Sequence, residues 1–378
     1  MVDRCDCRCR GLTRVVMRLW YYVISNRERN DNPMKAKRIT LKEVAQKAGV
    51  SVPAVVQAMN GTGRLKEATR RHIIRTAQQL GYRPHAAAHA MRTGRYNAVA
   101  LIHSRFRVRS LYSPALQQGI LRACCENGLT LVVGQCSDDE LLAEDHDLPE
   151  FLRKWVADGL LLNYNAQIPE KLIERVAHWR LPAVWINSKH ATDCVYPDDF
   201  GAAAMATEQL LAKGYRHIAF VCYVHGSREV PLHYSGKDRF AGYADTMTKA
   251  GLTPRHIQPQ LGMRGRAAGV FSAEWLRRED RPEAVITYSA MEARCIVHAA
   301  MEAGISPNSF PVIAFHHAVV DDAGYELPTL IVPNEAMGER AVQLLQKKLA
   351  EGPDCSLPPT PIPYNGIANS HLIGAKQA

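Results

Sequence analysis

The sequence predicts an all-α N-terminal unit with a helix-turn-helix motif, followed by a larger α/β region built on doubly wound parallel sheets. Residues 38–60 read as two short helices joined by a tight turn. From Ala98 onward, continuous apolar runs alternate with helical stretches, which is typical of buried parallel strands covered by helices on both faces. At 378 residues, the chain is long enough for two or three folding units.

The capping residues predict the first two helices. Thr40 and Glu43 fit a capping box, and Gly49 suits the left-handed position that ends a helix. Ser51 can cap the second helix, with Pro53 in its first turn. A helix pair with such a turn places its second helix in a DNA major groove, although ordinary buried helical hairpins show the same pattern.

A third helix and a linker follow the pair. The helix runs from about Glu67 to Leu80, with Ile73 and Ala77 on one face, and it completes a small three-helix core. In residues 84–95, a proline can start a helix and the alanines favour one, but the segment is too short to be stable alone. We expect a linker that folds only when it is docked.

Basic residues are concentrated around these helices. Residues 34–95 hold 13 Lys or Arg and two acids, whereas residues 96–378 hold 27 basic and 31 acidic residues. The chain as a whole has a net charge of +10. A solvated surface would not predict this asymmetry, which is the electrostatic footprint of contact with nucleic-acid phosphates.

The α/β region can be divided into elements by its apolar runs. The predicted strands are 98–102, 129–133, 159–162, 183–186, 217–222, 284–287, 311–315 and 329–332. The helices between them include 114–126, 202–213, 239–250, 291–303 and 335–350. A ligand of such a sheet binds outside the carboxyl ends of its strands.

Several classes of protein are excluded. Cys5, Cys7 and Cys9 lack a matching His or Cys pair, so we expect no metal site, and the scattered remaining cysteines predict reduced thiols in a cytosolic protein. Residues 15–24 are too short for a membrane span. No nucleophile–base arrangement or phosphate-binding Gly-rich loop indicates an enzyme or a cofactor. We expect residues 1–33 to be a disordered arm, or to precede a natural start at Met34.

Residues 38–95 resemble the DNA-binding headpiece of the lactose-repressor (LacI/GalR) family of bacterial transcription regulators. The matching strings are LKEVAQKAGVS, MNG, QQLGYRP and the A-H-A-M-R-T-G run of the linker. The resemblance continues, more divergently, to near the C-terminus. It implies a DNA-binding domain at 34–83, a hinge helix at 84–95, and a two-lobed effector-binding and dimerisation domain at 96–378, similar to periplasmic sugar-binding proteins. One lobe would take about 96–197 and 333–360, and the other about 198–332 and the tail.

The resemblance also implies which residues contact DNA. The family's Thr-Val-Ser-Arg run appears here as Ala54-Val55-Val56-Gln57, which removes hydroxyls and one charge. Val52 and Ala54 can still contact a thymine methyl, and Gln57 can pair with adenine. Met91 stands where the family wedges a Leu into the minor groove. The expected contacts are Thr40, Ser51, Val52, Pro53, Ala54, Gln57, Asn60, Arg64, Tyr82, His85, Ala88 and Met91, with Arg70 among the candidates for the DNA backbone. The alternative is a headpiece that has lost sequence specificity.

The expected effector-binding residues are Tyr112, Asn187, Arg239, Ser289 and His316. Arg239 keeps the family's R-x-x-G pattern and would bind a ligand hydroxyl or carboxylate in bidentate fashion. His316 replaces the carboxylate that typically holds sugar hydroxyls. With few acids expected, Arg239 and His316 suit a sugar acid or a phosphorylated sugar, and a neutral sugar bound through other contacts is the alternative.

The resemblance therefore implies a cytoplasmic, nucleoid-associated homodimer that regulates transcription, as a repressor in carbohydrate metabolism. It would bind a pseudopalindromic double-stranded DNA operator, and a sugar or sugar derivative would control that binding. We expect no membrane partner. The alternative function is a sugar-binding receptor of a transport system, which shares the two-lobed fold.

Overall fold

The computed structural model describes residues 39–83, 90, 93–106, 109–111, 113–136, 157–224, 233–260, 262–306, 309–322, 324–352 and 354–376. The chain divides into two compact units, with the boundary between Ala88 and His89. Four of the predicted site residues lie outside the described residues: His85, Ala88, Met91 and Tyr112. The N-terminal segment 1–33 lies outside them as well.

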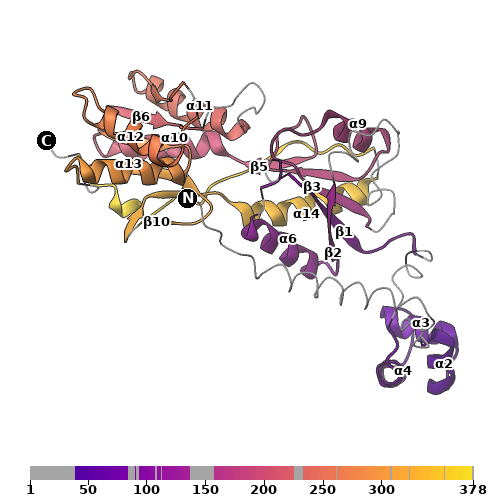
Figure 1. The fold of residues 1–378 in the computed structure, drawn as a ribbon. Coiled ribbons are helices and arrows are strands. Elements are labelled where there is room, and N and C mark those ends of the chain that lie inside the picture. The colour runs from indigo at the N-terminus through magenta and orange to yellow at the C-terminus, as the bar shows by residue number, and fades with distance from the viewer. Residues whose placement is uncertain are drawn as a thin grey trace, which may run out of the picture. The chain divides into compact units, whose positions relative to one another are not determined.

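The described residues of the first unit form three helices, α2 (Leu41–Ala48), α3 (Val52–Asn60) and α4 (Glu67–Gln79) (Figure 1). The capping box at α2 is confirmed, because the Glu43 N–H donates to the Thr40 hydroxyl at 3.3 Å and the Thr40 N–H donates to the Glu43 carboxylate at 2.7 Å. Gly49 ends α2 at φ 67°, a left-handed conformation that glycine adopts without strain. The three helices enclose one small core, formed by Val44, Ala45, Ala48, Val55, Ala58, Ile73 and Ala77.

The second unit contains two α/β lobes, each with a six-stranded sheet (Figure 1). All strands of the lobe 1 sheet are parallel, in the order β13-β5-β4-β3-β1-β2. These strands are β1 (Ala98–Ser104), β2 (Thr130–Cys136), β3 (Gly159–Asn163), β4 (Ala183–Ile186), β5 (Cys194–Pro197) and β13 (Thr360–Ile362). The helices α6 (Pro114–Glu126) and α14 (Asn334–Glu351) contribute to the core on one face of this sheet, and α9 (Glu170–His178) contributes to the other.

The lobe 2 sheet has the order β14-β12-β9-β8-β6-β7, with only the short edge strand β14 antiparallel to its neighbour. Its strands are β6 (Ile218–Val221), β7 (Arg255–Ile257), β8 (Ala284–Thr287), β9 (Val312–His316), β12 (Thr329–Ile331) and β14 (Ile367–Ala368). A hairpin of β10 (Val320–Asp322) and β11 (Tyr325–Leu327) and a 3-10 turn, η2 (Ser370–Leu372), complete the lobe. The covering helices are α10 (Asp199–Ala212), α11 (Tyr234–Lys249), α12 (Gly265–Leu276) and α13 (Ala290–Glu302). The predicted fold class is therefore confirmed.

The chain crosses between the two sheets three times. It leaves lobe 1 after Pro197, returns between Ile331 and Asn334, and crosses again between Ile362 and Ile367. The ends of the strands that carry the site therefore meet where the lobes are joined. In the described residues, no helix has the length and apolar character that crossing a bilayer requires.

Candidate functional site

The first candidate site is the exposed face of α3 in the three-helix unit. Val55 and Ala58 face the core, whereas Val52, Pro53 and Gln57 are exposed. Ala54 and Val56 are half-buried. A helix with this exposure can enter a major groove, and the side chains that it offers to base edges are mostly apolar.

The other predicted DNA contacts surround this face with different exposures. Thr40 and Ser51 cap α2 and α3, with the Ala54 N–H donating to the Ser51 hydroxyl at 3.4 Å. Asn60 and Arg64 are exposed at and after the end of α3, and Tyr82 is half-buried against the helical core. Their contacts with DNA stay predictions.

Arg70 is engaged within the protein. Its guanidinium donates to the carbonyl oxygens of Gln57 at 3.1 Å, Ala58 at 3.4 Å and Thr62 at 3.2 Å. It therefore closes the C-terminal end of α3, where helix carbonyls have no intrahelical partner and favour a cation. The sequence suggested Arg70 as a contact to DNA phosphate, and the structure gives it a role in positioning α3.

The second candidate site is a cavity of about 260 Å³ between the lobes of the second unit. It lies at the carboxyl ends of β3, β4, β5, β8, β9 and β12, where parallel sheets bind ligands. Four of the five predicted effector residues line it: Asn187, Arg239, Ser289 and His316.

Arg239 is buried and not on the surface. Its Nε donates to the Asp199 carboxylate at 2.7 Å, and a terminal nitrogen donates to the Tyr288 carbonyl at 2.6 Å. The guanidinium also lies 4.1 Å from the centre of the Phe315 ring. A further N–H makes a long contact of 3.5 Å to the Tyr364 hydroxyl. The remaining two of the five guanidinium N–H groups have no hydrogen bond among the described residues.

Asp199 is the residue that sequence reasoning missed. It is 1% exposed and lines the cavity, so the expectation of a pocket with few acids needs correction. Its Oδ1 accepts from Arg239 and from the Tyr364 hydroxyl, each at 2.7 Å, and its Oδ2 has no hydrogen-bond partner in the described part of the chain. The signal was the Asp198-Asp199 pair directly after a strand, at the start of a helix.

A hydrogen-bond chain fixes the cavity wall between the lobes. The Asn187 backbone, held at φ 53°, accepts at its carbonyl from His233 Nε2 at 3.1 Å. Because a carbonyl only accepts, His233 Nδ1 is the acceptor for the Ser235 hydroxyl at 2.8 Å, and the Ser235 oxygen in turn contacts the Tyr288 hydroxyl at 3.2 Å. Burial lowers the pKa of His233, in agreement with a neutral imidazole.

Contacts between the lobes continue beside this chain. The Tyr234 hydroxyl donates to Asn187 Oδ1 at 2.9 Å. Lys189 in lobe 1 pairs with Asp238 in lobe 2, and its ammonium lies 4.9 Å from the centre of the Tyr196 ring. The loop after β4 is therefore attached to the start of α11.

Two predicted effector residues have partners of their own. The Ser289 hydroxyl donates to Glu292 in the capping box of α13, so little of its donor capacity faces a ligand. His316 is half-buried at the end of β9, and burial lowers its pKa. Its neighbour His317, whose pKa is also lowered by burial, contacts Asn334 Nδ2 through Nδ1 at 2.9 Å.

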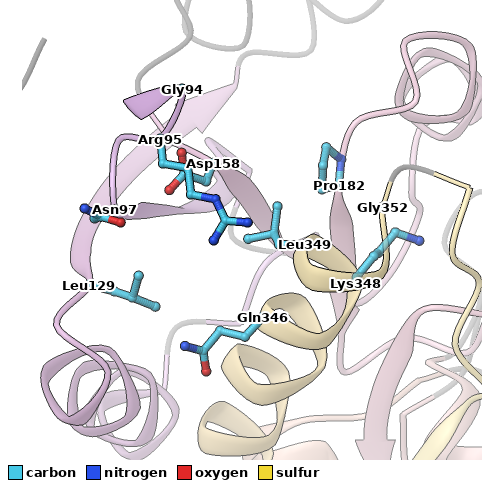
Figure 2. Close-up of a pocket in the computed structure, with 10 residues that line it drawn as sticks. All are labelled: Gly94, Arg95, Asn97, Leu129, Asp158, Pro182, Gln346, Lys348, Leu349 and Gly352. Carbon is cyan, nitrogen blue, oxygen red and sulfur yellow. The ribbon is translucent and has the colours of Figure 1, made fainter. Parts of the chain in front are cut away.

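A second cavity, of about 340 Å³, lies at the opposite edge of the lobe 1 sheet (Figure 2). It is lined by residues that precede β1 to β4, such as Asn97 and Asp158, and by the last turns of α14. Figure 2 shows the Arg95 side chain extending beside Asp158 towards Leu349. None of the four predicted effector residues that the structure describes lies there. Among the described residues, no group of three or more metal-binding side chains exists.

Comparisons with known proteins find relatives of both units. The family profile described as "Bacterial regulatory proteins, lacI family" matches residues 40–85, and that of a "Periplasmic binding protein-like domain" matches residues 207–364. The transcriptional regulator PtxS of Pseudomonas plecoglossicida is 30% identical over 62% of this chain and 68% of its own length. Catabolite control protein A of Priestia megaterium is 27% identical over 82% of this chain and 92% of its own length.

The fold is also found in solved structures. A lac repressor dimer bound to operator and the anti-inducer ONPF superimposes with a TM-score of 0.67 at 19% identity, over 90% of this chain and all of that one. A complex of the regulator CelR with cellobiose has a TM-score of 0.53 at 21% identity, over 87% of this chain and 98% of that one. At such identities the structures show the fold alone. From its sequence relatives and its helix-turn-helix, the chain belongs to the lacI family of bacterial regulatory proteins, which are DNA-binding transcriptional regulators and not enzymes.

Proposed function

We propose that this chain is a homodimeric, cytoplasmic repressor whose affinity for a pseudopalindromic operator is controlled by a small ligand in the cavity between its lobes. The observation that carries the proposal is the presence of both parts in one chain. The exposed face of α3 can read DNA, and the cavity lies at six strand ends and is lined by several polar side chains. A transport receptor has no use for the basic three-helix unit, so that alternative is not favoured.

We further propose a sugar or sugar derivative as the ligand. The cavity combines hydrogen-bonding side chains such as Asn187 and Ser235 with the rings of Tyr288 and Phe315. Polar groups fix the hydroxyls of a sugar, and aromatic faces pack against its C–H surface. At about 260 Å³, the cavity suits a ligand of monosaccharide size.

Dimerisation follows from the small reading face. A single α3 offers only Val52, Pro53, Ala54 and Gln57 to base edges, which is too few to specify an operator. Two copies related by a two-fold axis read two half-sites, and the operator then has matching symmetry.

The test is selection of bound duplexes from a random DNA library by the full chain, followed by band shifts with and without sugars. We expect a pseudopalindrome to be enriched, with a sugar changing the affinity for it. Gln57→Ala should relax the preference at one symmetry-related pair of positions, by up to about 3 kcal/mol per base pair. Gln78→Ala, on the exposed surface of α4, is the matched control and should leave the selected sequence unchanged.

A different result would contradict the proposal. If the library yields only binding that depends on salt and not on sequence, the apolar reading face has lost its specificity. If a specific site is found but no sugar alters its occupancy, the DNA-binding part of the proposal is supported and the sugar part is contradicted.

A further inference from the structure

We propose that Asp199 is the hydrogen-bond acceptor for a neutral, hydroxyl-bearing ligand, and that it connects the occupied cavity to the segments that join the lobes. This inference rests on the proposed function of the cavity as a ligand site. It assigns a role to a residue outside the predicted site, and it chooses between the two sugar classes that the sequence left open.

The position of Asp199 in the fold is the first argument. It is the first residue of α10 and stands two residues after Pro197, the last residue of lobe 1 before the first crossing. Tyr364, which donates to its Oδ1, follows β13 at the third crossing. One carboxylate in the cavity wall therefore links two of the three crossings directly.

The hydrogen bonds of the carboxylate are the second argument. Oδ1 accepts two hydrogen bonds, whereas the equally buried Oδ2 accepts none from the described residues. A buried carboxylate oxygen without a donor is unusual, because its lost hydration is not offset. Because Asp199 lines the cavity, a ligand hydroxyl that reaches its carboxylate can supply the missing donor.

The charge of the cavity is the third argument. Among the described residues that line it, Asp199 and Arg239 are the ionised groups, and they form an ion pair. His233, His316 and His317 also line it, and burial lowers the pKa of each below its usual 6.5. The lining is therefore close to neutral at pH 7. An anionic ligand would lie beside the Asp199 carboxylate with no uncompensated cation, so a neutral ligand is favoured.

These contacts give a route from ligand to lobe arrangement. A carboxylate is rigid and planar, so a hydroxyl held at Oδ2 fixes the plane in which Oδ1 meets Arg239 and Tyr364. Arg239 belongs to α11 and also holds the Tyr288 carbonyl after β8. Ligand binding then selects one arrangement of the crossing segments, which is the differential interaction that any coupling between sites requires.

The test uses the full chain and calorimetry with a panel of neutral hexoses, the corresponding uronic acids and hexose 6-phosphates. The wild-type protein should bind a neutral hexose at least tenfold more tightly than its uronic acid or its phosphate. Asp199→Asn should weaken that binding at least tenfold, because the amide nitrogen donates where the carboxylate oxygen accepts. It should also improve binding of the uronic acid, since Arg239 is left without its counter-ion.

Tyr364→Phe is the second variant. It removes one link between Asp199 and the third crossing but leaves Oδ2 in place. We expect its hexose affinity to stay within about threefold of wild type, while the effect of the hexose on operator affinity is reduced. Far-UV circular dichroism and cooperative unfolding verify that each variant is folded.

Three results would overturn the inference: a wild-type preference for the uronic acid or the phosphate, hexose binding by folded Asp199→Asn at wild-type affinity, or a panel in which nothing binds. None of these results bears on DNA binding, which the library selection tests separately. If Asp199→Asn does not fold, the ligand preference of the wild type and the behaviour of Tyr364→Phe still decide the matter.

Discussion

At the scale of single residues, Arg70 shows that a charged side chain on one helix can stabilise the end of another helix. It lies on α4, yet its guanidinium reaches four carbonyl oxygens at and after the end of α3, those of Gln57, Ala58, Thr62 and Gly63. Its neighbour Arg71 pairs with Glu67 on the same helix, with both side chains largely exposed. The two arginines are adjacent in sequence and differ in what their removal would cost.

Arg70→Ala should therefore destabilise the three-helix unit by about 1–2 kcal/mol, because the carbonyls at and after the end of α3 lose a charged donor. Arg71→Ala, the matched control, should change the free energy of unfolding by less than about 0.5 kcal/mol. Urea unfolding of the full chain, followed by circular dichroism, measures both changes. Equal effects of the two variants would show that Arg70 is not the cap that its contacts indicate.

The residue scale also shows the limit of sequence reading. Thr40, Gly49 and Ser51 were predicted correctly as caps because the atoms that they bond lie within five residues. Asp199 and Arg239 are 40 residues apart and Asp199 and Tyr364 are 165 apart, so no local pattern joins them. Only four residues of the cavity lining were predicted, all through a resemblance, and its acid was not predicted at all.

At the scale of elements, α6 and α14 pack closely against each other and both contribute to the core of lobe 1 (Figure 1). Gly338 on α14 faces the backbone of α6, where an added Cβ would overlap the Leu116 carbonyl oxygen and lie 2.9 Å from the Ile120 nitrogen. Neither atom belongs to a flexible side chain. The helices can therefore pack at this distance only because a glycine stands at the contact.

Gly338→Ala should destabilise the chain by about 1–3 kcal/mol through overpacking. Gly269→Ala in α12 is the control, since nothing lies within 4 Å of the added Cβ. There the lower helix propensity of glycine makes the alanine variant more stable, by up to about 1 kcal/mol. Thermal unfolding of both variants measures the difference, and a stabilising Gly338→Ala would contradict the packing argument.

Long elements were predictable from sequence, and short edge strands were not. The predicted helix 114–126 agrees with α6, because its periodicity is local and Ser113 caps it. The predicted start of α11 at 239 is five residues late, since His233 caps the helix and polar residues fill its first turn. The edge strand β13 and its neighbour β5 are three and four residues long and pair with each other across more than 160 residues, so their own sequences hold little signal.

At the scale of the whole molecule, histidines with lowered pKa values in both lobes set a common response to acid. Burial lowers the pKa of His103, His190, His233, His316 and His317. In the unfolded chain these imidazoles titrate near pH 6.5. Below that pH, the unfolded state binds more protons than the folded one, so stability is lost as the pH falls towards the lowered folded values.

We therefore expect the urea midpoint of the full chain at pH 5.5 to lie below that at pH 7.5. Glu292 acts in the opposite sense, because burial raises its pKa above 4.5 and the folded state then gains protons as the pH falls. Glu292→Gln, which can still cap α13, should enlarge the decrease. A midpoint that is unchanged or higher at pH 5.5 in both proteins would be inconsistent with lowered imidazole pKa values in the folded chain.

The three crossings have a consequence for synthesis on the ribosome. Lobe 1 is begun first, but α14 and β13 are encoded after lobe 2, and the face that Met337, Val342 and Leu345 will cover stays open until then. At roughly 5–20 residues per second, the interval of about 140 residues between Pro197 and Asn334 lasts on the order of ten seconds. A nascent chain released before Ile362 lacks an edge strand in each sheet, because β14 is made later still. Truncated translation products should therefore be left to chaperones and proteases with neither lobe complete.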